Sequence, residues 1–153
     1  GRKYDADGNL KDWWTNEDAK KYMEKADIVV EQFNAFVAVD TLTVNGELTL
    51  GENLADLGGM AIAYKAFLKT LKGNEPKIDG FTPQQRFFLA WATVWRDNMT
   101  DQEQRLRLKT DVHAPGKFRG FANLTNFQPF YDAFDIKDTD PIARPKDKRV
   151  TVW

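Results

Sequence analysis

The 153-residue sequence contains no cysteine and only one histidine, His113. Without cysteine, neither a disulfide framework nor a thiolate metal site can form. The 22 Lys and Arg residues are balanced by 23 Asp and Glu residues, so the chain lacks the basic excess that nucleic-acid binding normally needs. No apolar run approaches the ~20 residues of a membrane span. We therefore expect no cysteine-based site and no nucleic-acid partner.

The sequence does contain ample material for a hydrophobic core. Aromatic residues make up 13% of the chain, with five Trp and eleven Phe. The length is that of about one ordinary domain. We therefore expect one folded unit with a core rich in aromatic side chains.

The first half of the chain predicts two long helices separated by a hairpin. Thr15 begins a capping-box pattern, and apolar residues at helical spacing extend it to a helix over about 16–38. Alternating residues around Asn45-Gly46 predict a β-hairpin over 41–50. With a two-residue turn the apolar residues of its two strands lie on opposite faces, so either the turn contains a bulge or both faces are covered. Apolar steps of three and four then predict a helix over about 52–71.

Shorter helices are predicted for the second half. Residues 74–81 are typical of a linker, and Thr82-Pro83 begins a helix over about 83–98 that is apolar on nearly every side. We expect a short charged helix over 101–109 and a small aromatic helix near Phe127. Residues 149–153 alternate like a strand. The fold class is therefore mainly α with one small β-hairpin.

Residues 51–59 read Gly-Glu-Asn-Leu-Ala-Asp-Leu-Gly-Gly and are the most informative stretch. Glu52 and Asp56 lie four residues apart, which places both carboxylates on one helix face, in the first turns, where the helix dipole favours negative charge. From spacing alone they are either a solvated acidic helix start or a metal ligand with a supporting carboxylate. Gly58 and Gly59 are costly in a helix, so they suggest the close passage of another backbone.

A second motif, Asp-x-His-x-Pro-x-x-x-Arg, contains Asp111, His113 and Arg119. A single histidine is more often a surface or core residue than a catalytic one. An oriented positive donor is nevertheless what stabilises developing negative charge in many active sites. The aromatic run that ends at Trp95 is by itself most simply part of the core.

The pattern Glu-Asn-x-Ala-Asp-x-Gly-Gly resembles the signature of the neprilysin family of zinc metallopeptidases, which includes endothelin-converting enzyme and bacterial oligoendopeptidase O. This resemblance implies that Glu52 is the third protein ligand of a catalytic Zn²⁺ and that Asp56 steadies a zinc-bound histidine. It also implies the fold, which would be the helical C-terminal part of a thermolysin-like catalytic domain.

The resemblance extends to the second motif and to the aromatic run. It implies that His113 donates to the oxyanion of the scissile carbonyl, that Asp111 orients His113, and that Arg119 binds the substrate backbone beyond the cut. Trp95 takes the position of a residue that lines the pocket for the side chain after the cut. The expected function is hydrolysis of oligopeptides with a hydrophobic residue after the scissile bond.

The resemblance covers residues 1–153. This sequence does not contain the family's His-Glu-x-x-His helix, which supplies two zinc ligands and the general base. We therefore expect residues 1–153 to be the C-terminal part of a catalytic domain, inactive alone, with the remainder of the same polypeptide and peptide substrates as partners. Removal of the zinc helix should expose apolar surface and favour self-association. The absence of cysteine favours a bacterial source, and we expect a location outside the cytoplasm.

Two other functions remain open at this point. A helical, Trp-rich and nearly neutral domain could be a non-catalytic module that binds peptides or glycans. A purely structural helical domain is the third alternative, but it does not account for the two charged motifs occurring together.

Overall fold

The computed structural model describes residues 2–152, so the predicted strand-like ending at Trp153 lies partly outside the described residues. The elements in chain order are α1 (Asn16–Asn34), β1 (Val37–Val39), β2 (Leu42–Thr43), α2 (Gly46–Leu68), α3 (Pro83–Val94), α4 (Asp101–Thr110), α5 (Gly116–Phe121), the 3-10 turn η1 (Leu124–Asn126), α6 (Gln128–Phe134) and the 3-10 turn η2 (Lys146–Lys148). The predicted class, mainly helical with a small hairpin, is confirmed.

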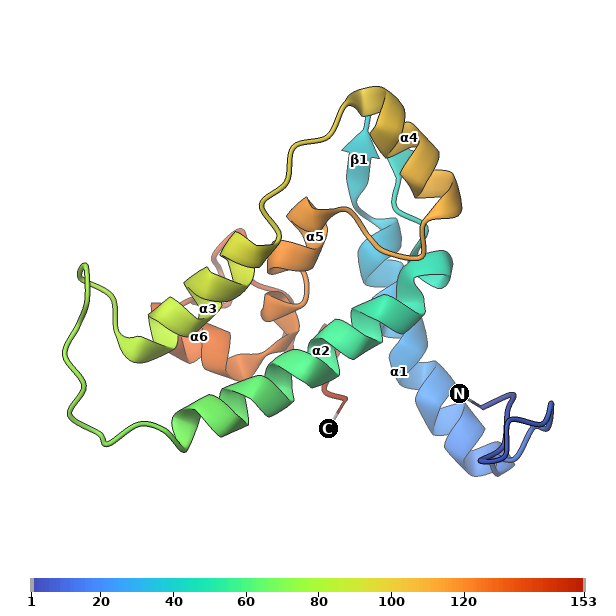
Figure 1. Cartoon of the computed structure of the whole chain (residues 1–153), viewed down its shortest axis with the longest axis horizontal. Helices are drawn as coiled ribbons and strands as arrows, with labels where there is room; N and C mark the ends of the chain where they lie inside the picture. Colours follow the sequence, from blue (N-terminus) through green and yellow to red (C-terminus); the bar gives the residue numbers. More distant parts are fainter. Residues whose placement is uncertain (1, 153) are drawn as a thin grey trace.

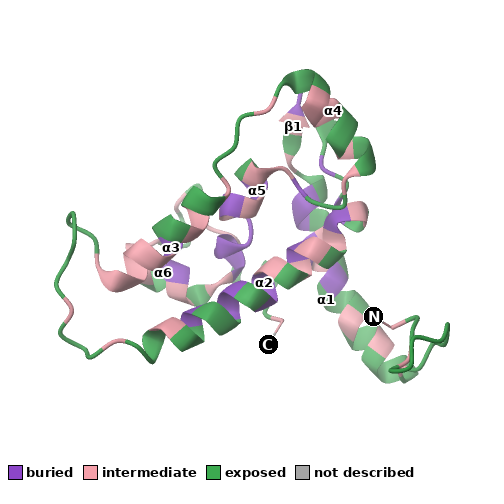
Figure 2. Cartoon of the chain, in the orientation of Figure 1, coloured by how far each residue is buried: buried purple, intermediate pink, exposed green. Residues whose placement is uncertain are grey.

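The long helix α2 runs through the middle of the molecule and contributes to both hydrophobic clusters (Figure 1). Near its start it packs against α1, and Figure 2 shows buried residues where the two helices meet. Leu57 belongs to a cluster with α1 and α5, whereas Met60 and Tyr64 belong to an aromatic cluster with α3 and α6. Helix α2 therefore connects two cores, and side chains on its middle turns lie between them.

The hairpin is present, but its predicted position is wrong. Val39 pairs with Leu42, and the turn between the strands is at Asp40-Thr41, with Asp40 at φ 52°. Asn45 is instead the N-cap of α2, because its side chain accepts a hydrogen bond from the backbone N–H of Leu48 at 2.9 Å. Asparagine followed by glycine suits both a tight turn and a helix start.

Gly46 explains why the helix start prevails there. A Cβ at this position would collide with the backbone carbonyl oxygen of Val30 in α1. The Asn34 side chain at the end of α1 also joins the two helices at this point, because it accepts a hydrogen bond from the Gly46 N–H at 2.7 Å. A close backbone approach occurs at Gly46, whereas a Cβ at Gly59, for which such an approach was predicted, would meet nothing within 4 Å.

Three boundaries of the first two helices also differ from the predictions. Helix α1 ends at Asn34 rather than near residue 38, because the chain turns into β1. Helix α2 begins six residues before Glu52, so Glu52 and Asp56 lie beyond the first turn, where the dipole effect has faded. At its other end α2 stops at Leu68, and Gly73, with φ 89°, lies in the following loop rather than directly after the helix.

The second half agrees more closely with the predictions. The predicted capping box of α3 is confirmed, with Thr82 and Gln85 each accepting a backbone hydrogen bond from the other. Within this chain α3 is less enclosed than its composition suggests: Phe88 is buried, but Val94 is 72% exposed. Helix α4 packs on the hairpin, and α5 and α6 pack against α3 (Figure 1). No described helix is both long and apolar enough to cross a membrane.

Candidate functional site

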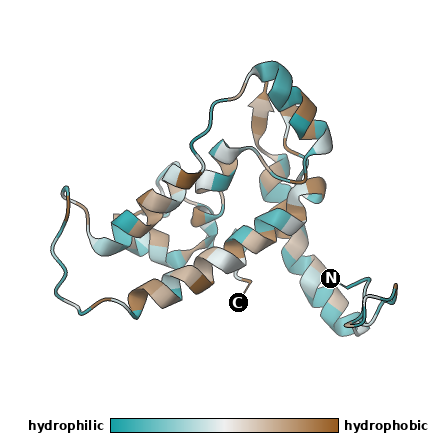
Figure 3. Cartoon of the chain, viewed as in Figure 1, coloured by the Kyte–Doolittle hydropathy of each residue, from teal (hydrophilic) through white to brown (hydrophobic). Residues whose placement is uncertain are grey.

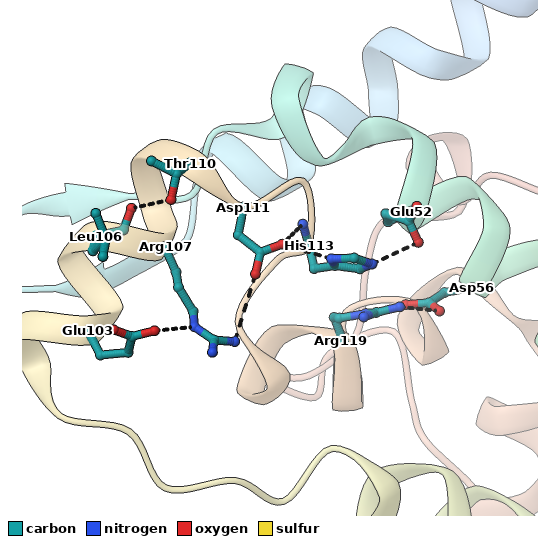
Figure 4. A network of polar contacts seen from close by, with 9 residues as sticks. All are labelled: Glu52, Asp56, Glu103, Leu106, Arg107, Thr110, Asp111, His113 and Arg119. Carbon is teal, nitrogen blue, oxygen red and sulfur yellow. Dashed lines mark hydrogen bonds and ion pairs between the residues drawn. The ribbon is translucent and has the colours of Figure 1, made fainter.

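Glu52 and His113 are distant in sequence but adjacent in the fold. Glu52 points from α2 toward the loop between α4 and α5, where its Oε2 lies 3.2 Å from His113 Nε2 (Figure 4). Both side chains are partly open to solvent, with exposed fractions of 40% and 44%. The predicted metal ligand and the predicted oxyanion donor thus lie side by side on an accessible surface.

Asp111 holds the His113 ring from the other side. Its Oδ1 lies 2.7 Å from His113 Nδ1 and also accepts the backbone N–H of His113 at 2.9 Å. Because a carboxylate only accepts, Nδ1 carries a proton in this arrangement, and Nε2 is left to face Glu52. These backbone and side-chain hydrogen bonds from His113 hold the pKa of Asp111 below its usual value.

Arg107 extends this charged row along α4. Its Nε donates to Glu103 at 2.7 Å, and its NH1 lies 3.8 Å from Asp111 Oδ2 (Figure 4). The side chain is half exposed, so its attraction to Asp111 is screened by water. Sequence analysis did not single out Arg107, although its spacing of four from both Glu103 and Asp111 on a charged helix was a usable signal.

Asp56 and Arg119 form the second part of the site. They are 63 residues apart in sequence, and Arg119 donates from Nε and NH2 to the two carboxylate oxygens at 2.7 and 2.8 Å. Both side chains are largely buried, with exposed fractions of 10% and 12%. Asn123 adds a bond from Nδ2 to Asp56 Oδ2 at 3.3 Å. The predicted supporting carboxylate therefore holds the predicted substrate-binding arginine.

Trp95 covers one face of the Arg119 guanidinium. The Cζ atom of Arg119 lies 3.8 Å from the centre of the Trp95 ring, which is the distance range of a cation–π contact. One turn earlier, Trp91 donates from its indole N–H to the backbone carbonyl of Arg119 at 3.2 Å. The end of α3 thus fixes both the side chain and the backbone of Arg119. Sequence analysis missed Trp91, although it lies four residues before Trp95.

Close packing at Gly116 places α5 beside the end of α3. A Cβ at Gly116 would lie 2.6 Å from the carbonyl oxygen of Trp95 and 3.0 Å from Asp97 Oδ1. Any larger residue would push the start of α5 away from α3. The glycine in the second motif therefore brings Arg119 within reach of Trp95.

A pocket of about 280 Å³ opens beside these groups. Its lining includes Trp95, Arg107, Asp111, His113 and Arg119, with apolar contributions from the neighbouring loop. Two cationic side chains and a histidine therefore face a space large enough for a few atoms of a peptide. Glu52 and Asp56 lie at its side rather than in its lining.

The described residues do not form a complete zinc site. Among residues 2–152, no three His, Cys, Asp or Glu side chains are grouped closely enough to hold a metal ion. A catalytic zinc site uses three protein ligands and an open position. Glu52 is accessible, and the His113 ring is its only polar side-chain partner among the described residues, so it fits the part of one ligand. The rest of the donor set is not present in residues 2–152.

The structure brings the six predicted site residues into two adjacent groups. Glu52, His113 and Asp111 form one, and Asp56, Arg119 and Trp95 form the other. They come from α2, the segment before α5, α5 itself and the end of α3. Figure 4 shows all of them except Trp95. The roles that the resemblance implies for them remain predictions.

Comparison with known proteins agrees with this arrangement. A sequence profile described as Peptidase family M13 matches residues 1–150. An endothelin-converting enzyme homolog of Locusta migratoria is 41% identical over 138 residues, which cover 88% of this chain and 19% of the relative. A neutral endopeptidase of Lactococcus lactis subsp. lactis is 35% identical over 153 residues, or 100% of this chain and 23% of the relative. The chain thus spans about a fifth to a quarter of these relatives.

Solved structures agree in fold. The zinc metalloprotease Zmp1 of Mycobacterium tuberculosis, in complex with an inhibitor, superposes with a TM-score of 0.90 at 39% identity, over 99% of this chain and 24% of that one. PepO from Lactobacillus rhamnosis superposes with a TM-score of 0.83 at 33% identity, over 100% of this chain and 23% of that one. With its two charged motifs assembled in the same fold, and with residues 1–150 matched, this chain belongs to peptidase family M13.

Proposed function

We propose that this chain forms one side of the active site of a zinc-dependent endopeptidase that hydrolyses oligopeptides. The observation that supports this most strongly is the contact between Glu52 and His113, 3.2 Å apart on an accessible surface. A carboxylate that binds a metal and a ring that donates to an oxyanion must be neighbours if both are to act on one carbonyl group, and Glu52 and His113 are neighbours here.

Glu52 is the third zinc ligand in this proposal. The other ligands and the general base come from the remainder of the same polypeptide, because the described residues do not complete a metal site. Bound zinc supplies Lewis-acid polarisation of the peptide carbonyl and an activated water. The chain alone therefore neither holds zinc tightly nor hydrolyses peptides.

His113 donates from Nε2 to the oxygen of the scissile carbonyl as negative charge develops there. Asp111 keeps the ring in the required orientation through Nδ1, at 2.7 Å. When both ring nitrogens are protonated, the ring donates to Asp111 and to the reacting oxygen at the same time. A donor held in place before the reaction costs no reorganisation during it.

Arg119 binds the backbone of the substrate beyond the cut. Its Nε and NH2 point to Asp56 and one face lies on Trp95, which leaves NH1 as the donor without an assigned bond among the described residues. Trp95 then has two functions, since it orients Arg119 and offers apolar surface to the side chain after the cut. A hydrophobic residue at that substrate position fits such a wall.

Substitution of Glu52 tests the proposal in the full-length protein. Glu52→Gln keeps the size of the side chain but removes the charge that binds zinc, so we expect zinc per chain and peptide hydrolysis to be lost together. Glu47→Gln is the matched control, because Glu47 lies exposed in the first turn of the same helix. Zinc is measured by elemental analysis and hydrolysis with a hydrophobic fluorogenic peptide.

Two outcomes would contradict the proposal. Retention of zinc and normal turnover in Glu52→Gln would remove Glu52 from the metal site. A full-length protein that stays zinc-free when zinc is added, but binds peptides, would favour the alternative function, a non-catalytic helical module that binds peptides or glycans.

A further inference from the structure

Asn123 is a completely buried polar residue, with an exposed fraction of 0%, next to the second part of the site. It directly precedes η1, with helical backbone angles of φ −66° and ψ −36°, and its side chain does not cap that turn. Instead, Nδ2 donates to Asp56 Oδ2 at 3.3 Å, whereas Oδ1 has no hydrogen-bond partner.

This orientation follows from the chemistry of Asp56. A carboxylate can only accept, so the amide must turn its NH2 group toward it, and Oδ1 then faces away. A buried oxygen without a partner is costly. Asparagine therefore leaves Oδ1 without a bond at this position, and the contact that it makes in exchange is with Asp56.

The contact adds a third donor to a carboxylate that Arg119 already holds. Arg119 donates one bond to each oxygen, and the bond from Asn123 reaches Oδ2, which also accepts from Arg119 Nε. A bidentate pair fixes the two groups relative to each other, and Trp95 holds the pair on the Arg119 side. Asn123, buried directly before η1, adds a third donor that holds the pair on the Asp56 side. Both contacts together set the direction of the Arg119 guanidinium.

Asn126 provides the comparison within the same short helix. It is also buried, at 2% exposed, but its hydrogen bonds go to Gln32, to the carbonyl of Ala122 and from the N–H of Val150. All of these partners belong to the scaffold. One buried asparagine of this segment thus joins core elements, and the other reaches the site.

We propose that Asn123 is a positioning residue, which holds the Asp56–Arg119 pair so that Arg119 presents its remaining donor to the substrate backbone. The proposal rests on the proposed function for its effect on substrate binding. Its effect on the pair itself does not depend on that function. Asn123 touches neither substrate nor metal in this scheme and acts through Asp56.

The test compares the full-length protein with its Asn123→Leu and Asn123→Ala variants. Leucine has a similar size and removes both the donor and the unpaired oxygen, so the fold should be retained; alanine serves if leucine does not fit. Asn126→Ala is the control for a buried amide lost from the same helix. In ¹⁵N-arginine-labelled protein, hydrogen exchange of the Arg119 Nε–H reports how firmly the pair is held. The signal that disappears in Arg119→Lys is assigned to the Arg119 Nε–H.

We expect Arg119 Nε–H exchange to become at least threefold faster in both Asn123 variants and to stay unchanged in Asn126→Ala. With a peptide substrate, we expect KM to rise at least threefold while kcat and zinc content stay unchanged. The reason is that the weakened contact, from Arg119 to the substrate backbone, is made equally in the ground state and the transition state. Unchanged exchange in the Asn123 variants, or an equal increase in Asn126→Ala, would overturn the proposal. Absence of hydrolysis by the unsubstituted protein would refute the proposed function, and the exchange rates would still decide the role of Asn123.

Discussion

At the scale of single residues, the contact between Asp56 and Arg119 dominates the site. Its two charges are nearly withdrawn from water and compensate each other through two short hydrogen bonds. Such a pair adds little net stability but is costly to break, because the remaining charge stays buried without a partner. The same pair therefore fixes Arg119 and makes the site sensitive to substitution.

We expect Asp56→Asn to lower the free energy of unfolding by about 3 kcal/mol, because the positive charge of Arg119 stays buried without its counter-ion. The matched control is Asp40→Asn. It breaks the exposed pair with Arg105, and it should cost less than about 1 kcal/mol. Asparagine also tolerates the positive φ of Asp40. Urea unfolding of both variants measures the difference, and equal costs would show that the Asp56 pair is not protected from water.

Asp111 makes stability depend on pH in the acid range. Its pKa is lowered in the folded chain by the hydrogen bonds from His113, so its contribution is fully present above the ordinary Asp pKa of about 3.9. The contribution is lost as the pH falls through the lower folded value. We therefore expect the stability difference between the unsubstituted chain and Asp111→Asn to shrink as the pH falls below about pH 4. Urea unfolding at each pH tests this, and a difference that grows on acidification would contradict it.

At the scale of elements, the crossing of α1 and α2 is set by one glycine. The backbone of α1 passes so close to Gly46 that no side chain fits, and the neighbouring Asn45 caps the same helix. The position at which α2 starts in turn sets the directions in which the Glu52 and Asp56 side chains project from the helix. The geometry of the site thus depends on packing two turns earlier in the helix.

Alanine substitution should have opposite effects at two glycines of α2. Gly46→Ala places a methyl group against the Val30 carbonyl and should cost about 2 kcal/mol or more, because the helices must separate. Gly59→Ala, with open space around its Cβ, should stabilise the chain by up to about 1 kcal/mol through helix propensity. Thermal unfolding of both variants is the measurement. Stabilisation by Gly46→Ala would mean that the two helices do not cross at this distance.

At the scale of the whole molecule, several large apolar side chains are exposed to solvent. Figure 3 shows how hydrophobic and hydrophilic residues are distributed along the elements. Val94 at the end of α3 is 72% exposed, and Leu106 on α4 and Val37 on β1 are 56% and 55% exposed. These residues flank the elements that carry the site. In the proposed full-length protein, the remainder of the polypeptide covers part of this surface.

We expect the chain alone to self-associate at micromolar concentration, because exposed apolar surface is removed from water by contact with a second copy. Replacement of Val94 and Leu106 by Lys should reduce this association without loss of helix content, since both side chains point outward. Light scattering after size-exclusion chromatography measures the mass. A monomer at every concentration tested would show that the exposed residues are too scattered to drive association.

Local interactions could be predicted from the sequence because they depend on neighbours along the chain. The capping box of Thr82 and Gln85, the helical spacing of α4 and the types of side chain in both charged motifs needed no knowledge of the fold. Asn45-Gly46 was wrongly predicted as a turn because the same dipeptide suits two local structures. The close approach of Val30 decided between them.

Contacts between distant segments could not be predicted in this way. That Arg119 bonds Asp56, that His113 faces Glu52 and that Asn123 supports the pair depends on the path of the chain around α2. The sequence by itself determined the helical class, the local caps and which residues carry the chemistry, since these follow from neighbours and side-chain type. Only the tertiary structure decided which carboxylate meets which cation, because that choice is made by the packing of helices distant in sequence.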